Sequence, residues 1–293
     1  MILLLVVAGC ETEKDPVDQP LDPSLHLTDG FCLVSNSRVV LNHYDIDYYD
    51  FSAHLIYLKD PGAYEEKFKV SGASATVYAD STRIYDLHFY SALASYIIEG
   101  PVIMVPQIFY PDYTVAIENF WTSEQMAKEG DPRPDPRIRE ALEMYGQFRH
   151  GLQCEIASVQ QTAPGEVELK LELWNQDALN YYYWDPEKLG MERYHYVTNG
   201  LFLVDENGRH YRDHIQSLSW DGADPDRLSL LESDSSVVLT LGYEEFDTLP
   251  PGTYDAYFRF PAQHHNIARE DLDLEDGRIW LGELQLYKQI VVE

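Results

Sequence analysis

The segment Glu166-Val-Glu-Leu-Lys-Leu-Glu-Leu-Trp174 decides the fold class of this 293-residue chain. Apolar side chains at Val167, Leu169, Leu171 and Leu173 alternate with charged ones. Successive side chains of a β-strand point to opposite faces of a sheet, so the alternation predicts an antiparallel strand with one buried and one solvated face. The sequence around residue 170 therefore indicates a β protein.

On both sides of this segment, short runs rich in Val, Ile, Tyr and Phe recur between Gly, Pro, Asn and Asp clusters. Such runs with turn residues between them are typical of strands in an all-β fold. We predict strands at 31–41, 51–59, 68–70, 75–79, 83–89, 102–108, 113–120, 152–160, 166–174, 179–184, 200–205, 209–213, 236–243, 253–260 and 278–292. The chain is therefore expected to be mainly β.

One helix is expected near the middle of the chain. Residues 131–137 are too rich in proline for regular structure, and Ile138, Leu142, Tyr145 and Phe148 then follow at helical spacing. This pattern predicts a helix over 138–149 and a domain boundary beside it. We expect an N-terminal β-rich domain at 26–125, a linker with the helix at 126–150, and a second domain at 151–293.

The second domain carries two turn motifs. Glu206-Asn207-Gly208 predicts a hairpin, because Asn-Gly tolerates the positive φ of a tight turn. The run Leu249-Pro-Pro-Gly-Thr-Tyr254 resembles the start of a late strand in bacterial immunoglobulin-like domains. The resemblance implies an immunoglobulin-like β-sandwich of seven or eight strands, a tyrosine that helps lock a corner, and an insertion around 185–199. It implies a fold and no activity.

The N-terminus Met1-Ile-Leu-Leu-Leu-Val-Val-Ala-Gly-Cys10 is an apolar run that ends in small residues and a cysteine. It is shorter than the roughly 20 residues of a membrane span but typical of a secretory signal peptide. The segment Val7-Ala8-Gly9-Cys10 resembles the lipobox of bacterial lipoproteins. The resemblance implies removal of residues 1–9 and attachment of diacylglycerol and a further acyl chain, such as palmitate, at Cys10. An accidental cysteine after an apolar start is the alternative.

Two features accompany this expected lipid anchor. Signal peptides begin with Lys or Arg, so we expect a basic segment upstream of Met1. Residues 10–25 are rich in Asp, Glu and Pro and predict a disordered tether. Their acidity resembles the surface-export signal of some diderm lipoproteins, which implies a cell-envelope location at the outer membrane.

The net charge of the chain limits the classes of molecule that it can bind. It has 50 acidic and 21 basic residues, and its formal net charge is −29. Such a surface repels phosphate backbones, which excludes nucleic acid as a partner. An envelope protein or a glycan is the expected partner, besides the membrane contacted through the lipid; solubility at a crowded surface is the alternative explanation of the charge.

Lipidation of Cys10 would leave Cys32 and Cys154 as a pair in an oxidising compartment. Both lie in apolar runs of predicted strands. A disulfide between them would join the N-terminal region to the second domain, and two separate buried thiols are the alternative.

No catalytic motif stands out. There is no Gly-x-Ser-x-Gly segment and no His-Glu-x-x-His segment, and carboxylates are so abundant that a chance pair is expected. We expect no cofactor. His210 and His214 lie in a predicted strand and His264-His265 in a loop, where two zinc ligands are not brought together. Residues 220–226 and 271–277 are acidic loops, and Asp271, Asp273 and Glu275 are weak calcium candidates.

Aromatic residues offer one further candidate. In Asn180-Tyr-Tyr-Tyr-Trp184, Tyr181 and Tyr183 share one face of the predicted strand, and Tyr182 and Trp184 share the other. One pair is expected to fill the core. The other, with Tyr181 and Tyr183 as the candidates, would form a platform for sugar or peptide; cross-strand packing is the alternative role.

These patterns favour a non-enzymatic binding or assembly lipoprotein of the cell envelope, with its ligand unknown. The rival hypothesis is an envelope hydrolase that acts on glycans through carboxylates between the domains. A third is a lipid-tethered inhibitor or accessory subunit. A deep acidic cleft would favour the hydrolase, and an exposed aromatic face would favour binding.

Overall fold

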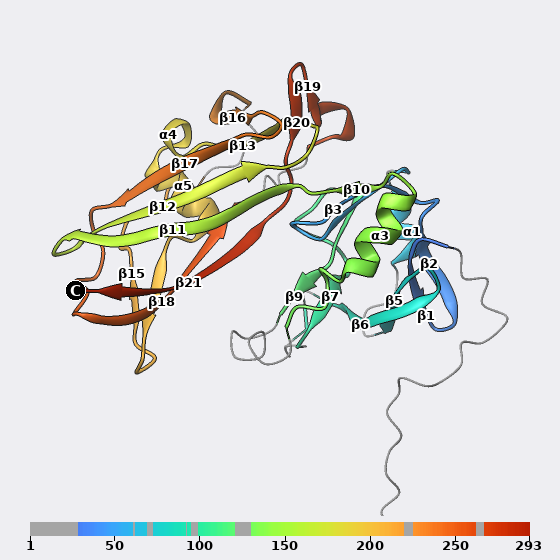
Figure 1. Ribbon diagram of the computed structural model, residues 1–293, viewed down its shortest axis with the longest axis horizontal. Helices are drawn as coiled ribbons and strands as arrows, with labels where there is room; N and C mark the ends of the chain where they lie inside the picture. The colour runs from blue at the N-terminus through green and yellow to red at the C-terminus, as the bar shows by residue number, and fades with distance from the viewer. Residues whose placement is uncertain are drawn as a thin grey trace, which may run out of the picture.

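The computed structural model describes residues 29–60, 62–68, 73–91, 93–94, 99–120, 130–219, 225–261 and 267–293. The expected signal peptide, Cys10, the whole expected tether and His264-His265 lie outside these ranges. Figure 1 shows two bodies, the N-terminal half in blue to green and the C-terminal half in yellow to red. The predicted mainly β fold is confirmed. No helix among the described residues is both long and apolar enough to cross a membrane.

Within its described residues, the N-terminal half has two sheets and two helices. The strands are β1 (Phe31–Ser35), β2 (Arg38–Asn42), β3 (Ile46–Asp50), β4 (Leu55–Leu58), β5 (Ser74–Ala79), β6 (Thr82–Tyr90), β7 (Pro101–Met104), β8 (Thr114–Ala116), β9 (Glu118–Asn119) and β10 (Phe148–Arg149), and the helices are α1 (Ala63–Lys67) and α3 (Pro136–Met144). A six-stranded sheet has the order β2-β1-β5-β6-β7-β9, and a four-stranded sheet has the order β10-β3-β4-β8.

Helix α3 begins and ends for local reasons. The Asp135 side chain accepts a hydrogen bond from the Arg137 amide, and Pro136 occupies the first turn. The predicted end at 149 is wrong, because Gly146 adopts a positive φ of 66° and Phe148 instead pairs with Tyr49 in the four-stranded sheet. The helix packs into the N-terminal core, so this part of the expected linker belongs to the N-terminal half.

The described part of the C-terminal half contains three sheets. Its strands are β11 (Leu152–Ala163), β12 (Glu166–Asn175), β13 (Tyr181–Trp184), β14 (Phe202–Asp205), β15 (His210–Arg212), β16 (Leu228–Leu231), β17 (Ser236–Tyr243), β18 (Gly252–Phe260), β19 (Asp273–Leu274), β20 (Gly277–Ile279) and β21 (Leu284–Val292); its helices are α4 (Pro186–Leu189), α5 (Met191–Thr198), η2 (Pro225–Arg227) and η3 (Arg269–Asp271). The sheet orders are β11-β12-β17, β15-β14-β18-β21 and β16-β13-β20-β19.

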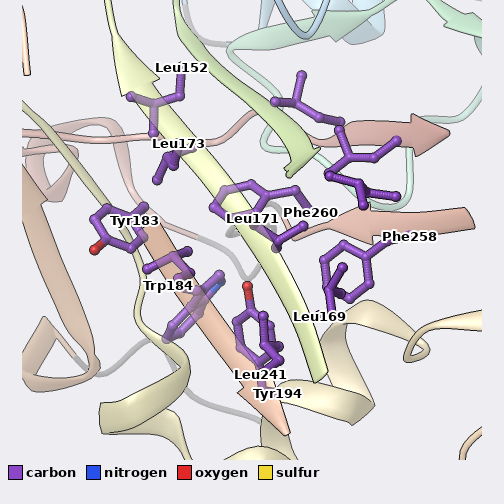
Figure 2. Packing of buried hydrophobic residues seen from close by; sticks show 14 of the residues in the cluster. Leu152, Leu169, Leu171, Leu173, Tyr183, Trp184, Tyr194, Leu241, Phe258 and Phe260 are labelled. Atoms are coloured by element: carbon purple, nitrogen blue, oxygen red, sulfur yellow. The ribbon is translucent and has the colours of Figure 1, made fainter. Parts of the chain in front are cut away.

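The first two of these sheets form a sandwich-like pair around one core. In β12 the predicted alternation is confirmed: Val167, Leu169, Leu171 and Leu173 are buried, and the residues between them are partly exposed. Figure 2 shows these leucines in one cluster with side chains from β13, β17 and β18. The Tyr254 hydroxyl donates to the Pro250 carbonyl at 2.6 Å, as in a tyrosine corner.

Several element boundaries differ from the predictions. The expected strand 31–41 is the hairpin β1–β2, and the expected strand 51–59 is only β4. The expected strand 278–292 is divided into β20 and β21 at Trp280, whose indole is buried against the other half of the chain. Strands β3 and β16 were not predicted. The Asn-Gly hairpin is confirmed as the β14–β15 pair, and the insertion at 185–199 forms α4 and α5.

The sheet β10-β3-β4-β8 is buried on both faces. In β4, Leu55 and Tyr57 belong to the C-terminal core, and Ile56 and Leu58 belong to the N-terminal core. Strand β8 divides in the same way. The two halves therefore share this sheet as a common layer.

The two cysteines outside the signal region are not bonded to each other. Cys32 and Cys154 are free cysteines. Cys32 packs with Val34 and Tyr78 on the face of β1 that points away from the N-terminal core, whereas Cys154 packs against the C-terminal core. The expected disulfide is therefore corrected to two separate thiols. Burial raises the pKa of Cys32 to about 11 and that of Cys154 further, which makes both thiols weak nucleophiles.

We predict that Leu171→Ala lowers the free energy of unfolding by about 2–5 kcal/mol, because it leaves a cavity at a fully buried position between Ile156 and Leu239. Chemical denaturation followed by fluorescence measures the change. The matched control is Lys170→Ala on the solvent side of the same strand, with an expected change within about 0.5 kcal/mol. Equal effects of the two substitutions would contradict the assignment of the buried face.

Candidate functional site

A buried polar network holds the two halves together where the chain passes between them. Asp50 ends β3, and its Oδ1 accepts hydrogen bonds from the Ser52 hydroxyl at 2.7 Å and from the amides of Ser52 and Ala53. Its Oδ2 accepts from the Trp280 indole at 2.7 Å, across 230 residues of sequence. A Cβ on Gly151 would lie 2.0 Å from Asp50 Oδ1, so the crossing point requires glycine.

A second carboxylate completes this junction network. Asp177 accepts from the amides of His150 and Gly151 at 2.7 and 2.8 Å, and from the Tyr181 hydroxyl at 2.8 Å. Burial raises the pKa of Asp50 to about 6, and the hydrogen bonds to its carboxylate oppose that shift. The network consists of structural contacts without an exposed reactive group, so it holds the two halves together and is not itself a binding site.

A cavity of about 560 Å³ opens between the two halves. This volume is within the usual range for small-molecule sites, which occur preferentially at domain interfaces. We name it the junction cavity, and it is lined by Tyr64, Pro106, Gln107, Ile108, Tyr110, Pro111, Asp112 and Tyr113 from the N-terminal half and by Ile267, Ala268, Arg269 and Glu270 from the C-terminal half.

Contacts between the halves fix the walls of the junction cavity. The Tyr113 hydroxyl donates to the Ile267 carbonyl at 2.9 Å. Arg269 Nη2 lies 2.9 Å from Asp47 Oδ2, and Arg269 Nη1 donates to the Leu58 carbonyl. The Arg269 guanidinium also lies 5.9 Å from the centre of the Tyr113 ring. The cavity is therefore held open by cross-half contacts within the described chain.

Two half-buried carboxyl groups, one from each half of the chain, have perturbed pKa values. Burial, and then the charge of Glu283, raise the pKa of Glu118 to about 7. Burial also raises the pKa of Glu283, whereas Arg259, whose Nε lies 3.3 Å from Glu283 Oε1, lowers it. Burial, and then the charges of these two carboxyl groups, raise the pKa of Tyr110. Perturbed carboxyl groups near a cleft are candidates for function, and sequence reasoning did not single these two out.

The structure corrects the aromatic candidates. Tyr181 and Tyr183 are 2% and 5% exposed, so they fill the core and offer no binding face. On the opposite face of the strand, Trp184 is also buried and Tyr182 is half-buried. Both faces of β13 are covered because Tyr181, Tyr183 and Trp184 all belong to the C-terminal core, and Tyr182 packs against it.

An aromatic row that was not predicted crosses the outer face of the sheet β15-β14-β18-β21. Phe202 stacks on Tyr257 with ring centres 5.0 Å apart and an interplanar angle of 12°, and Tyr257 lies 5.3 Å from Tyr287. Buried residues alternate with more exposed ones in β18, so strand alternation in the sequence could have predicted that Tyr257 lies on the outer face. Because the ring faces of Phe202 and Tyr257 stack on each other, the row stabilises the sheet as other cross-strand pairs do.

The calcium candidates are not brought together. Asp273 pairs with Arg278, whose Nη2 lies 2.9 Å from Asp273 Oδ2, whereas Asp271 ends η3 and Glu275 lies in the turn after β19. No group of three or more His, Cys, Asp or Glu side chains within the described ranges could hold a metal ion. His214 pairs with Asp247 at 2.9 Å. The acidic loop at 220–226 lies mostly outside the described residues.

No model of a protein family matches the chain, and no curated protein matches its sequence.

We predict that Asp50 makes the folded state less stable as the pH rises from about 4 to about 6. A buried carboxyl group with a raised pKa binds its proton more tightly when folded, so its contribution is present at low pH and is lost through this window. The loss is on the order of 2–3 kcal/mol. Denaturation at several pH values should show this loss in the wild type but not in Asp50→Asn.

Asp50→Asn should also be less stable at every pH, because its amide group cannot accept hydrogen bonds from both the Ser52 and the Trp280 side chains. The exposed Asp29→Asn is the control and should retain the wild-type pH profile. An unchanged slope between pH 4 and 6 in Asp50→Asn would show that Asp50 does not titrate there.

Proposed function

We propose that the protein is a lipid-anchored binding protein of the cell envelope, tied to the outer membrane through Cys10, that holds its ligand in the junction cavity. The observation that carries this proposal is the cavity of about 560 Å³ with one wall from each half of the chain. Its lining combines aromatic and aliphatic side chains with a few polar groups, which is the usual composition of a ligand site.

The anchor rests on the apolar run before Cys10 and on its resemblance to a lipobox. Several acyl chains, at ~0.8 kcal/mol per buried methylene, would make attachment effectively permanent. The acidic segment after Cys10 would then act as a tether that keeps the folded part away from the membrane.

We further propose that the C-terminal half is immunoglobulin-like. The sandwich-like pair of sheets and the hydrogen bond from Tyr254 to the Pro250 carbonyl support this assignment. Such a domain serves as a rigid support for loops, and here the loop at 267–270 forms one wall of the junction cavity. The fold by itself implies no activity.

One observation favours a second candidate function. Glu118, with a pKa raised to about 7, and Glu283 form a carboxyl pair between the halves. An envelope hydrolase acting on glycans could use Glu118 as a general acid. The binding function remains the leading proposal, because Glu283 is already engaged by Arg259.

We predict that Cys10→Ala moves the protein from the membrane fraction to the soluble fraction, because it removes the lipidated thiol. Immunoblotting of fractionated cells measures the distribution. Cys32→Ala, which changes a buried thiol in β1, is the control and should stay with the membrane. Retention of Cys10→Ala in the membrane fraction would refute the anchor.

We predict that Ala268→Trp abolishes ligand binding, because a large side chain at this half-buried position would fill the cavity. The measurement is retention of solubilised envelope glycans and proteins by the immobilised full chain. Ala163→Trp, at the end of β11, is the control and should bind normally. Equal retention by both variants would contradict binding in the cavity. Turnover of a glycan by the wild type, lost in Glu118→Gln, would support the hydrolase instead.

A further inference from the structure

Strand β17 is an edge strand of the sheet β11-β12-β17, in which β12 is the central strand (Figure 1). The Asn175 amide donates to the Ser235 carbonyl at 3.0 Å, and the register then continues without a bulge along the whole of β17. Hydrogen-bonded pairs alternate with non-bonded pairs along an antiparallel ladder. The main-chain groups of the odd-numbered residues of β17 therefore bond to β12, and those of the even-numbered residues point to the open edge.

The even-numbered residues are accessible as well as unpaired. Ser236, Val238, Thr240 and Gly242 are all exposed, and Val238 is 57% exposed. Their main-chain groups have no hydrogen-bond partner among the residues that the structure describes. A row of unpaired N–H and C=O groups on an edge strand is a template for a further extended chain. The open edge of β17 is therefore a docking surface for a strand.

The opposite edge of the same sheet is closed. On β11, the Lys288 ammonium group donates to the carbonyls of Ile156 and Ala157 at 2.8 and 2.7 Å, and the register shifts between Ile156 and Ser158. A bulge and a lysine are two of the devices that protect edge strands from unwanted pairing. Strand β17 has neither device, and its eight residues include no charged residue and no proline.

Negative charges flank both ends of β17. Glu232 and Asp234 precede the strand, and Glu244 and Glu245 follow it. All four side chains are exposed, and within the described ranges none of them has a salt bridge. Antiparallel pairing of β17 with a second copy of itself would bring the acidic residues after one strand close to those before the other. Such like-charge contacts disfavour self-pairing, whereas a segment with basic ends matches the edge.

We propose that the open edge of β17 binds an extended segment of a partner protein, which adds to the sheet as a further strand and carries Lys or Arg at both of its ends. Main-chain hydrogen bonds to the even-numbered residues supply the affinity, and the flanking carboxylates select the basic partner and its register. This inference concerns a protein partner and does not rest on ligand binding in the junction cavity.

Hydrogen exchange of the full chain in detergent, followed by NMR at residue resolution, tests the edge directly. In the free chain, the amides of Val238 and Thr240 should exchange rapidly, whereas those of Leu239 and Leu241 should be protected by β12. Strand β12 is the internal control, because both of its edges are paired and all of its amides should exchange slowly.

The probe for the partner is a synthetic peptide of three Thr-Val repeats with two lysines at each end. At a saturating concentration it should slow exchange of the Val238 and Thr240 amides at least about tenfold. A peptide of the same repeats with glutamates at its ends is the control. We expect the lysine peptide to bind at least about tenfold more tightly, and the difference should shrink as the salt concentration rises.

One substitution tests the main-chain bonds. Thr240→Pro removes an outward-pointing donor and places a ring at the edge, so it should reduce binding of the lysine peptide at least about tenfold. The N–H group of Thr240 makes no bond to β12, so the fold is retained. Thr240→Val keeps this N–H group and the branched side chain, and it should bind like the wild type.

A second substitution tests the charges and leaves the strand itself unchanged. Glu244→Lys combined with Glu245→Lys should weaken the lysine peptide several-fold and strengthen the glutamate peptide. Glu140→Lys combined with Glu206→Lys changes the net charge equally at exposed positions in α3 and in the β14–β15 turn. This control should keep the preference of the wild type for the lysine peptide.

Four results would each overturn the proposal. Protected Val238 and Thr240 amides in the dilute free chain would show that the edge is closed. Protection that grows with protein concentration would show that a second copy occupies it. Equal binding of the two peptides would remove the basic partner. Absence of binding, or binding of the lysine peptide without slower exchange in β17, would show that the edge does not accept the added strand.

Discussion

The rest of the structure depends on one sheet, β10-β3-β4-β8, that buries both of its faces. Alternate residues of β4 belong to different cores, with Leu55 and Tyr57 on one side and Ile56 and Leu58 on the other. Fully burying a side chain of this size contributes roughly 1.5–3 kcal/mol. Separating the halves would expose one face of the sheet and lose that contribution several times over, so the two halves behave as one folded unit.

Because this sheet is covered on both faces, polar groups at the end of β3 are shielded from water. The junction network provides hydrogen-bond partners for them. The carboxylate of Asp50 accepts from the turn that follows β3 and from the Trp280 indole of the other half. A buried carboxylate is costly unless it is hydrogen-bonded, so the position of Trp280 is constrained as strongly as that of Asp50. This constraint explains why β20 and β21 are separate strands: the chain must turn at Trp280 to place the indole.

A strand could be predicted from the sequence when one of its faces is solvated and the other is buried. Strand β12 has one wet face, so its alternation of Leu with Glu and Lys was visible, and the Asn-Gly turn and the first turn of α3 depend on local residues alone. Strand β4 has no wet face and therefore no alternation, and in β3 Asp47 is the one exposed residue. The four aromatic residues 181–184 define two faces of a strand without showing that both are covered. The junction cavity could not be predicted, because its walls meet through contacts such as Tyr113 with Ile267, 154 residues apart.

The shared sheet also determines how the junction cavity can bind a ligand. In many two-domain proteins a hinge opens and closes the cleft, but here a hinge motion would expose the face of β4 that carries Leu55 and Tyr57. The cavity is therefore preformed, and little of the binding free energy is spent on moving the halves. Selectivity must then come from the lining as it stands: the apolar side chains at its opening, an arginine that is already paired with Asp47, and two carboxylates at the rim. A ligand that contacts both walls would add to the stability of the same interface that forms its site.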